Sequence, residues 1–193
     1  MTIYGWLIFA LWFALVASWG LLAGGVKRSV GSRWIWWREI AVRLGFFALV
    51  VLALRVAVIA HALPNARLYA FNTSMLMGLI GFVFCVLGIG LAILGRAYLD
   101  RNWGVPKSKK EENAELVTTG PYALVRHPIY GGMLLAVLGS AIGQSALWLL
   151  PLIVYGPHFI LSARREENLL IEQCPERYRA YMKRTKMLLP FVL

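Results

Sequence analysis

Long apolar runs dominate this chain and restrict what it can fold into. Ile3–Ala23, about Ile40–Ala60 and about Ser74–Leu94 each come close to the roughly 20 residues that a helix needs to cross a bilayer. Two shorter runs, Ile129–Ile142 and Ala146–Leu161, are separated by a three-residue turn, so they predict a tight helical hairpin. Because 60% of the 193 residues are hydrophobic, the pattern excludes an ordinary soluble globular protein.

The basic residues predict how these runs are oriented. Lys and Arg number four in 24–39, one in 61–73, six in 95–128, none at the hairpin tip and seven after residue 161. The positive-inside rule then predicts an all-α integral membrane protein with five spans, an outside N-terminus and a cytoplasmic C-terminus. We expect three N-terminal spans over residues 1–94, and a functional core of cytoplasmic loop, hairpin and amphipathic tail helix over residues 95–193.

The net charge of +11 does not require a nucleic-acid partner. Basic loops between membrane spans account for it, and no nucleic-acid-binding motif accompanies it, so membrane lipids are the expected partners. Cys85 and Cys174 have neither the number nor the spacing of a disulfide framework or metal site. Arg55 lies deep in the second predicted span, where an isolated charge costs about 3 kcal/mol, so it is expected either to line a substrate passage or to reach a polar partner.

The first candidate for chemistry is the segment 120–132, just before the hairpin. Pro121 and Pro128 fix their own φ angles and are expected to push the residue before each, Gly120 and His127, into extended backbone. Arg126 and His127 would then form a rigid cationic corner above an apolar helix, suited to an anionic group at the membrane surface.

Two glycines follow this corner, at the first turn of the next helix. Gly131 and Gly132 carry no side chains, so we expect the free backbone N–H groups of that turn to be open to a ligand.

The second candidate follows the hairpin, at Glu166 and Glu167. Adjacent residues on a helix point about 100° apart, so at most one carboxylate is expected to face a site while the other stays in solvent. Glu167 is the expected inward one, because Leu170 and Ile171 share its face. An amphipathic surface helix with paired Arg and Glu residues is the alternative interpretation. Further on, Tyr178 and Tyr181 lie one turn apart.

Together these motifs resemble the isoprenylcysteine carboxyl methyltransferase family, whose wider membrane superfamily includes phospholipid N-methyltransferases. The resemblance covers residues 87–193. It rests on Gly120-Pro121-Tyr122, on Arg126-His127-Pro128-Ile129-Tyr130-Gly131, on the apolar hairpin, and on Glu166-Glu167, Leu170, Tyr178, Tyr181 and Leu189-Pro190.

The resemblance implies S-adenosylmethionine as cofactor. Its carboxylate would meet Arg126 or His127, its amino group or ribose would meet Glu167, and its adenine would lie against aromatic side chains. Gly90, in Gly88-Ile89-Gly90, resembles one of a glycine pair near the cofactor in related enzymes, although close helix packing also explains such a pair. The expected cofactor-binding residues are Gly90, Tyr122, Arg126, His127, Pro128, Tyr130, Glu166 and Glu167.

One departure from the family pattern concerns the acceptor. Members that methylate prenylcysteine place an arginine four residues before the glutamate pair, where this chain has Ser162. Arg55, Arg101 or Arg164 would have to replace it, and these three are the catalytic candidates.

The resulting expectation is methyl transfer to a lipophilic acceptor at the cytoplasmic face. A NADPH-dependent double-bond reductase and a non-catalytic membrane scaffold remain as alternatives. The small size of the chain favours a bacterial or archaeal plasma membrane. The acceptor, the nucleophile and the oligomeric state stay open.

Overall fold

The computed structural model describes residues 2–22, 45, 48, 73–99 and 116–188, and these form helices without a sheet. The α-helices are α1 (Ile3–Leu22), α3 (Met75–Leu99), α4 (Pro128–Gly143), α5 (Leu149–Gln173) and α6 (Pro175–Arg184). Two short 3-10 helices, η3 (Gly120–Ala123) and η4 (Ala146–Trp148), precede α4 and α5. The all-helical prediction is therefore confirmed for the described part of the chain.

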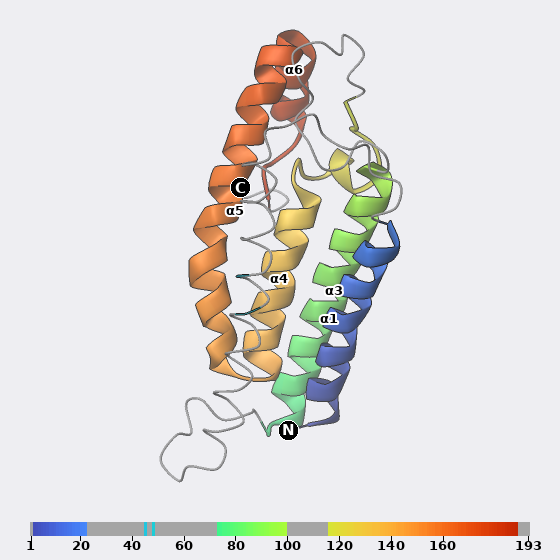
Figure 1. Cartoon of the computed structure of the whole chain (residues 1–193), viewed down its shortest axis with the longest axis vertical. Helices are drawn as coiled ribbons and strands as arrows, with labels where there is room; N and C mark the ends of the chain where they lie inside the picture. The colour runs from blue at the N-terminus through green and yellow to red at the C-terminus, as the bar shows by residue number, and fades with distance from the viewer. Residues whose placement is uncertain (1, 23–44, 46–47, 49–72, 100–115, 189–193) are drawn as a thin grey trace.

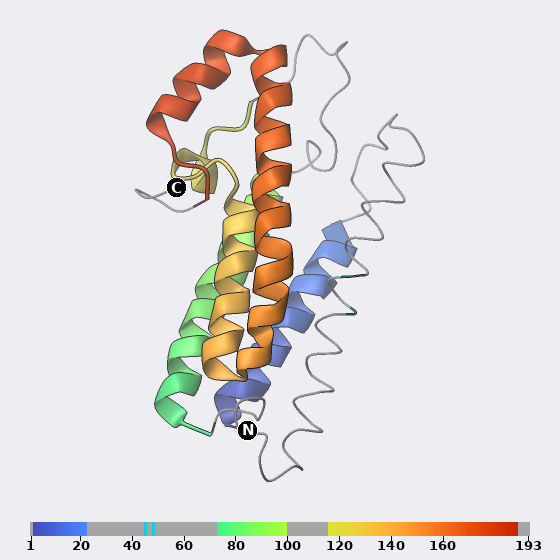
Figure 2. The same cartoon turned by 90° about the vertical axis from the view of Figure 1, so that its left-hand side faces the viewer.

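Four long helices lie side by side, and α6 crosses one end of them (Figures 1 and 2). α1 and α3 run toward the α6 end, α4 runs away from it, and α5 returns to it. α3 packs against both α1 and α4, while α5 packs against α4. This arrangement brings the start of α4 and the end of α5 to the same end of the bundle.

Glycines set the close approach of α3 and α4. A Cβ atom built on Gly88 would lie 2.5 Å from the carbonyl oxygen of Gly132, and one on Gly132 would lie 2.5 Å from that of Gly88. Lower in the same interface, Gly139 packs against Gly81 and Cys85 in the same manner. Small residues at helix interfaces are typical of membrane bundles, where van der Waals packing drives association.

Polar side chains tie α1 to α4 inside the bundle. The indole of Trp12 donates to Ser140 Oγ over 2.9 Å, and Gln144 Nε2 donates to the carbonyl of Gly5 over 2.7 Å. Ser140 and Gln144 are fully buried, and the ring of Trp12 stacks on that of Trp148. These contacts fix the rotation of α1, whose apolar sequence gives no preferred face.

The hairpin differs from its prediction in the second arm. The first arm, α4, is short as expected at 16 residues, but α5 continues for 25 residues through Pro157 and carries Glu166 and Glu167 on its last turns. The prediction that the second arm ends at Leu161, before the glutamates, is therefore wrong, because the same helix carries both. The tail helix is α6, which begins at Pro175 and buries Tyr178 and Tyr181.

Among the described residues, two helical segments are long and apolar enough to cross a membrane, Met75–Leu99 and Ala146–Gln173. Ile3–Trp19 and Pro128–Gly143 are shorter apolar helices. The predicted span over residues 40–60, with Arg55 in it, lies outside the described residues except for two helical positions, Gly45 and Ala48.

Candidate active site

The candidate site lies where η3, the start of α4, the end of α5 and α6 meet (Figure 2). The turn that leads into it begins at Gly120, which has φ of +60° and lies against the ring of Tyr98. The extended backbone predicted at Gly120 is therefore wrong, because this turn needs a left-handed residue and only glycine adopts that conformation without strain. At the other end of the turn, His127 has φ of −125° and directly precedes α4.

The chain after α6 returns to cover this turn. We call residues 185–188 the C-terminal strap. Val125 and Lys186 form a parallel bridge, the amide of Arg126 donates to the carbonyl of Lys186 over 2.8 Å, and that of His127 donates to Met187 over 3.0 Å. The strap therefore fixes the backbone from which the side chains of Arg126 and His127 project.

Arg126 and Glu167 form a buried ion pair. Arg126 Nε lies 2.6 Å from Glu167 Oε1, and the two side chains are only 9% and 7% exposed. The guanidinium also donates to the carbonyl of Thr185 over 2.5 Å. Charge-assisted hydrogen bonds of this kind are short and strong. One arginine thus links the turn, α5 and the C-terminal strap.

His127 lies between the two glutamates. Its Nε2 lies 3.3 Å from Glu167 Oε1 and its Nδ1 lies 3.5 Å from Glu166 Oε2. The prediction that Glu167 points inward is confirmed, since this residue is 5% exposed. The expectation that only one glutamate faces the site is wrong: the Glu166 side chain is 40% exposed but still reaches His127, because a long side chain spans the angle between the two positions.

Aromatic rings support this group from the bundle side. Tyr130 donates to Glu166 Oε1 over 2.5 Å, and its ring stacks on His127 with ring centroids 5.7 Å apart. The other face of Tyr130 stacks on Phe159 of α5, with centroids 5.1 Å apart. The stack joins the polar residues to the hydrophobic core of the bundle.

Three buried tyrosines complete the site. Tyr178 and Tyr181 pack edge to face, as their spacing predicts, and Tyr181 donates to the carbonyl of Tyr122 over 2.6 Å. Tyr122 in turn donates to the carbonyl of Gly95 over 3.3 Å. Burial raises the pKa of Tyr181 to about 12 and raises the pKa of Tyr122 and Tyr178 as well. These hydroxyls therefore stay protonated and serve as donors rather than bases.

The pKa of His127 moves in the direction that its two acidic neighbours dictate. Burial by itself lowers it, but the contacts with Glu166 and Glu167 and their negative charges outweigh burial and raise it above its ordinary value. A histidine with a raised pKa stabilises the fold fully below its unfolded pKa of about 6.5, and this contribution is lost as the pH rises through the folded pKa.

We therefore expect the melting temperature to fall as the pH is raised from about 6. Measuring melting temperature against pH for the intact protein and for His127→Gln checks this, because the variant should lose most of the slope. His158→Gln removes a half-buried histidine that contacts Tyr155 and Phe159 and should keep the slope. An unchanged slope in His127→Gln would contradict the prediction.

The glycines after the corner do not open a binding surface. Gly131 packs under the carbonyl of Leu188 and donates its own amide to His127, while Gly132 packs against α3. The expectation that both leave free N–H groups for a ligand is wrong, because the strap and α3 occupy that space. A Cβ atom built on Gly90 of α3 would have no described atom within 4 Å. Of the pair Gly88 and Gly90, only Gly88 packs closely against α4.

The three arginines predicted as catalytic are considered first, and a fourth arginine is buried near the site. Arg164 lies exposed on α5, and Arg55 and Arg101 lie outside the described residues. Arg96, at the end of α3, is only 3% exposed and lies near Tyr122. Sequence reasoning counted Arg96 only as a loop charge, and the signal that could have identified it is its position next to Gly95, where α4 approaches closely.

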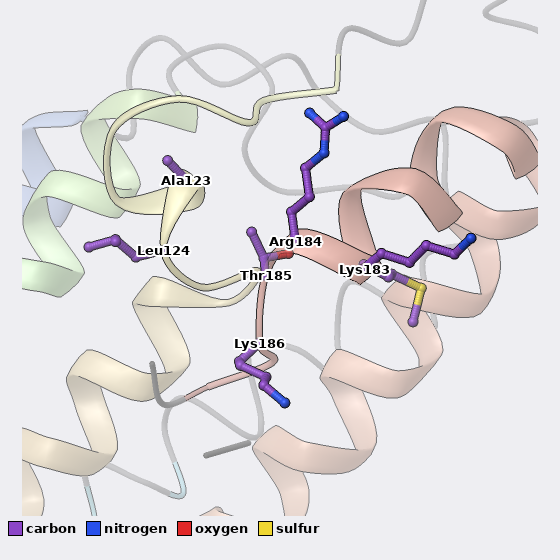
Figure 3. Close-up of a pocket in the computed structure, with 7 residues that line it drawn as sticks. Ala123, Leu124, Lys183, Arg184, Thr185 and Lys186 are labelled. Carbon is purple, nitrogen blue, oxygen red and sulfur yellow. The ribbon is translucent and has the colours of Figure 1, made fainter. Parts of the chain in front are cut away.

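A shallow groove of about 220 Å³ lies on the outer side of the strap. Ala123 and Leu124 line it from the turn, and Figure 3 shows Lys183, Arg184 and Lys186 on its other side with their charged ends pointing apart. The glutamates and His127 do not line this groove.

Comparison with solved structures defines the class of fold. The chain resembles the eukaryotic intramembrane Ras methyltransferase, isoprenylcysteine carboxyl methyltransferase, with a TM-score of 0.64 at 22% identity, over 77% of this chain and 53% of that one. The chain therefore shares the fold of that protein over the matched region. Residues 76–177 match the sequence model of the phospholipid methyltransferase family, and the chain belongs to that family.

Two bacterial relatives match at the sequence level. The cobalt-zinc-cadmium resistance protein CzcN of Cupriavidus metallidurans is 33% identical over 110 residues, and the nickel-cobalt-cadmium resistance protein NccN of Alcaligenes xylosoxydans xylosoxydans is 29% identical over 107. Each match covers 54% of this chain and 47% of the relative, so the chain spans about half the length of these relatives. Within the described ranges, no group of three His, Cys, Asp or Glu side chains is placed to hold a metal ion.

Proposed function

We propose that this protein transfers a methyl group from S-adenosylmethionine to a lipophilic acceptor at the α6 end of the bundle, the cytoplasmic end in the predicted five-span topology. The observation that carries the proposal is the group formed by buried His127 and Glu167 with the partly exposed Glu166, at the α6 end of an apolar bundle. Family membership supports the chemistry, since the matched region contains all three residues.

The residues of the site fit this cofactor by charge and shape. His127 Nε2 is buried 3.3 Å from Glu167 Oε1, without a well-aligned hydrogen bond within the described residues, so it is a candidate donor to a ligand oxygen. Glu166 is accessible enough to receive an ammonium group or ribose hydroxyls. Tyr130 is already stacked on His127 and Phe159, and Tyr122 is buried, so these rings would have to move to contact adenine. When bound, the cofactor supplies an electrophilic methyl group on a positively charged sulfur.

The protein's own contribution is alignment rather than acid–base chemistry. Arg126 and the C-terminal strap hold Glu167 and His127 in fixed positions, and Pro128 anchors the same turn at the first residue of α4. Holding two reactants in line supplies about 7–11 kcal/mol of barrier reduction, which suits a site whose buried tyrosine hydroxyls stay protonated.

The acceptor is expected to reach the site laterally through the membrane, between the helices. In this proposal Gly90 lies near the cofactor, and no described residue comes within 4 Å of a Cβ atom built at that position. Arg55, Arg101 and Arg164 are the candidates for an anionic acceptor group, in place of the arginine that Ser162 replaces.

Calorimetric titration of S-adenosylhomocysteine into the detergent-purified protein tests the proposal. We expect saturable binding, weakened at least tenfold in His127→Asn and in Glu166→Gln. Glu172→Gln changes an exposed carboxylate on the same helix and should bind like the unmodified protein. Absence of binding up to about 1 mM by folded protein, a free energy weaker than about −4 kcal/mol, would refute the proposal. Binding of NADPH instead would favour the reductase alternative.

A further inference from the structure

An exposed basic surface covers the outer side of α6 and its continuation. Residues 175–186 contain five Lys or Arg residues and one Glu. All five cationic residues are exposed, whereas the tyrosines between them are buried against the site. We call this the basic strip, and its members are Arg177, Arg179, Lys183, Arg184 and Lys186.

The strip is placed at a membrane boundary. α6 follows α5 after a single residue, and α5 belongs to a segment long and apolar enough to cross a bilayer. Figure 2 shows α6 crossing the end of the bundle rather than extending its axis. The anionic surface of a lipid leaflet attracts basic segments that lie at the end of a membrane-spanning helix.

The arrangement of the charges indicates an extended partner. Around the groove, the charged ends of Lys183, Arg184 and Lys186 point in different directions (Figure 3). They do not converge on one point, as a pocket for a single phosphate would require. Beside them, the side chain of Leu124 is 60% exposed and offers an apolar contact. Charged headgroups with apolar surface next to them are what a lipid leaflet presents.

We propose that the basic strip binds the anionic phospholipid headgroups of the leaflet at this end of the bundle, and that this contact holds the C-terminal strap closed. The second part follows from the hydrogen bonds already described. Lys186 belongs to both the strip and the strap, and its carbonyl accepts the amide of Arg126. The strap also accepts from the Arg126 guanidinium through the carbonyl of Thr185.

Hydrogen exchange of the full chain in lipid nanodiscs tests this proposal without any ligand. The discs contain zwitterionic phosphatidylcholine alone or with about a third of phosphatidylglycerol, a composition chosen to give a strongly negative surface. We expect the amides of residues 175–188 to exchange at least fivefold more slowly in the anionic discs. The amides of Arg126 and His127 should slow with them, since they donate to the strap. High salt should remove the difference.

A variant and its matched control locate the effect. Lys183→Gln/Arg184→Gln/Lys186→Gln should lose the difference between discs, and Arg164→Gln/Arg165→Gln, which removes two exposed cations of α5, should keep it. Equal amide exchange rates of the unmodified protein in the two kinds of disc would overturn the proposal. So would loss of the difference between discs in both the strip variant and the α5 control. Protection in neutral discs by inorganic phosphate, an oligonucleotide or an acidic peptide, without protection by anionic lipid, would overturn it too. Because no cofactor is present, these outcomes are independent of the S-adenosylhomocysteine titration.

Discussion

Replacing Glu167 with alanine is expected to destabilise the protein by about 3–5 kcal/mol, because it leaves the buried guanidinium of Arg126 without its carboxylate. For a chain of this size the melting temperature should fall by roughly 6–20 °C, which thermal unfolding in detergent measures. Glu172→Ala removes an exposed carboxylate one turn further along α5 and should shift the melting temperature little.

A double variant separates the lost charge from lost packing. Arg126→Met/Glu167→Leu removes both charges and keeps apolar volume, and buried ion pairs replaced in this way often lose little stability. It should therefore be more stable than Glu167→Ala alone. A Glu167→Ala protein as stable as the Glu172→Ala control would show that the pair does not stabilise the fold.

We expect Gly88→Ala and Gly132→Ala each to lower the free energy of unfolding. Overpacking costs about 1–3 kcal/mol, and we expect the upper end of that range here. Each new methyl group would meet a backbone carbonyl at 2.5 Å, and backbone cannot turn aside as a side chain does. Each clash involves the other glycine, so once one alanine has separated the helices the second should add less than its own cost. Thermal melting of both single variants and the double variant checks this.

Gly156→Ala is the matched control for these substitutions. Its Cβ atom would lie 3.9 Å from Leu134 Cδ2, which is an ordinary van der Waals contact between α5 and α4. It should leave the melting temperature nearly unchanged. If Gly156→Ala destabilised the protein as much as Gly88→Ala, the cost would come from glycine replacement in general and not from the α3–α4 contact.

The sequence predicts the helices of this fold well because hydrophobic runs of membrane length have few alternatives. The family resemblance implies that His127 and Glu167 belong to one cofactor site, and the structure brings them together because the hairpin arms return to one end of the bundle. The length of α5 was missed for a local reason: Pro157 suggests a break, but a helix in a bundle can continue through a proline when neighbouring groups satisfy the freed carbonyl.

The site details that sequence reasoning missed depend on contacts between distant residues. Nothing local indicates that Leu188 covers Gly131, or that Arg126 pairs with a glutamate 41 residues away. Helical spacing correctly separates the directions of Glu166 and Glu167 but ignores the reach of their side chains. The position of Arg96 next to Gly95 is visible in the sequence, but the contact of Gly95 with Pro128 and Ile129 is visible only in the assembled bundle.

Because Arg126 bonds to the C-terminal strap, the contacts of the site can form only after the helices of the bundle have been synthesised. The α3–α4 contact uses residues up to Gly143, so that packing can form while the rest of the chain is still on the ribosome. The carbonyls that hold Arg126 belong to Met182, Thr185 and Lys186. A nascent chain that stops short of them therefore has the bundle helices but not the strap, and Arg126 then has the carboxylate of Glu167 but not these backbone acceptors.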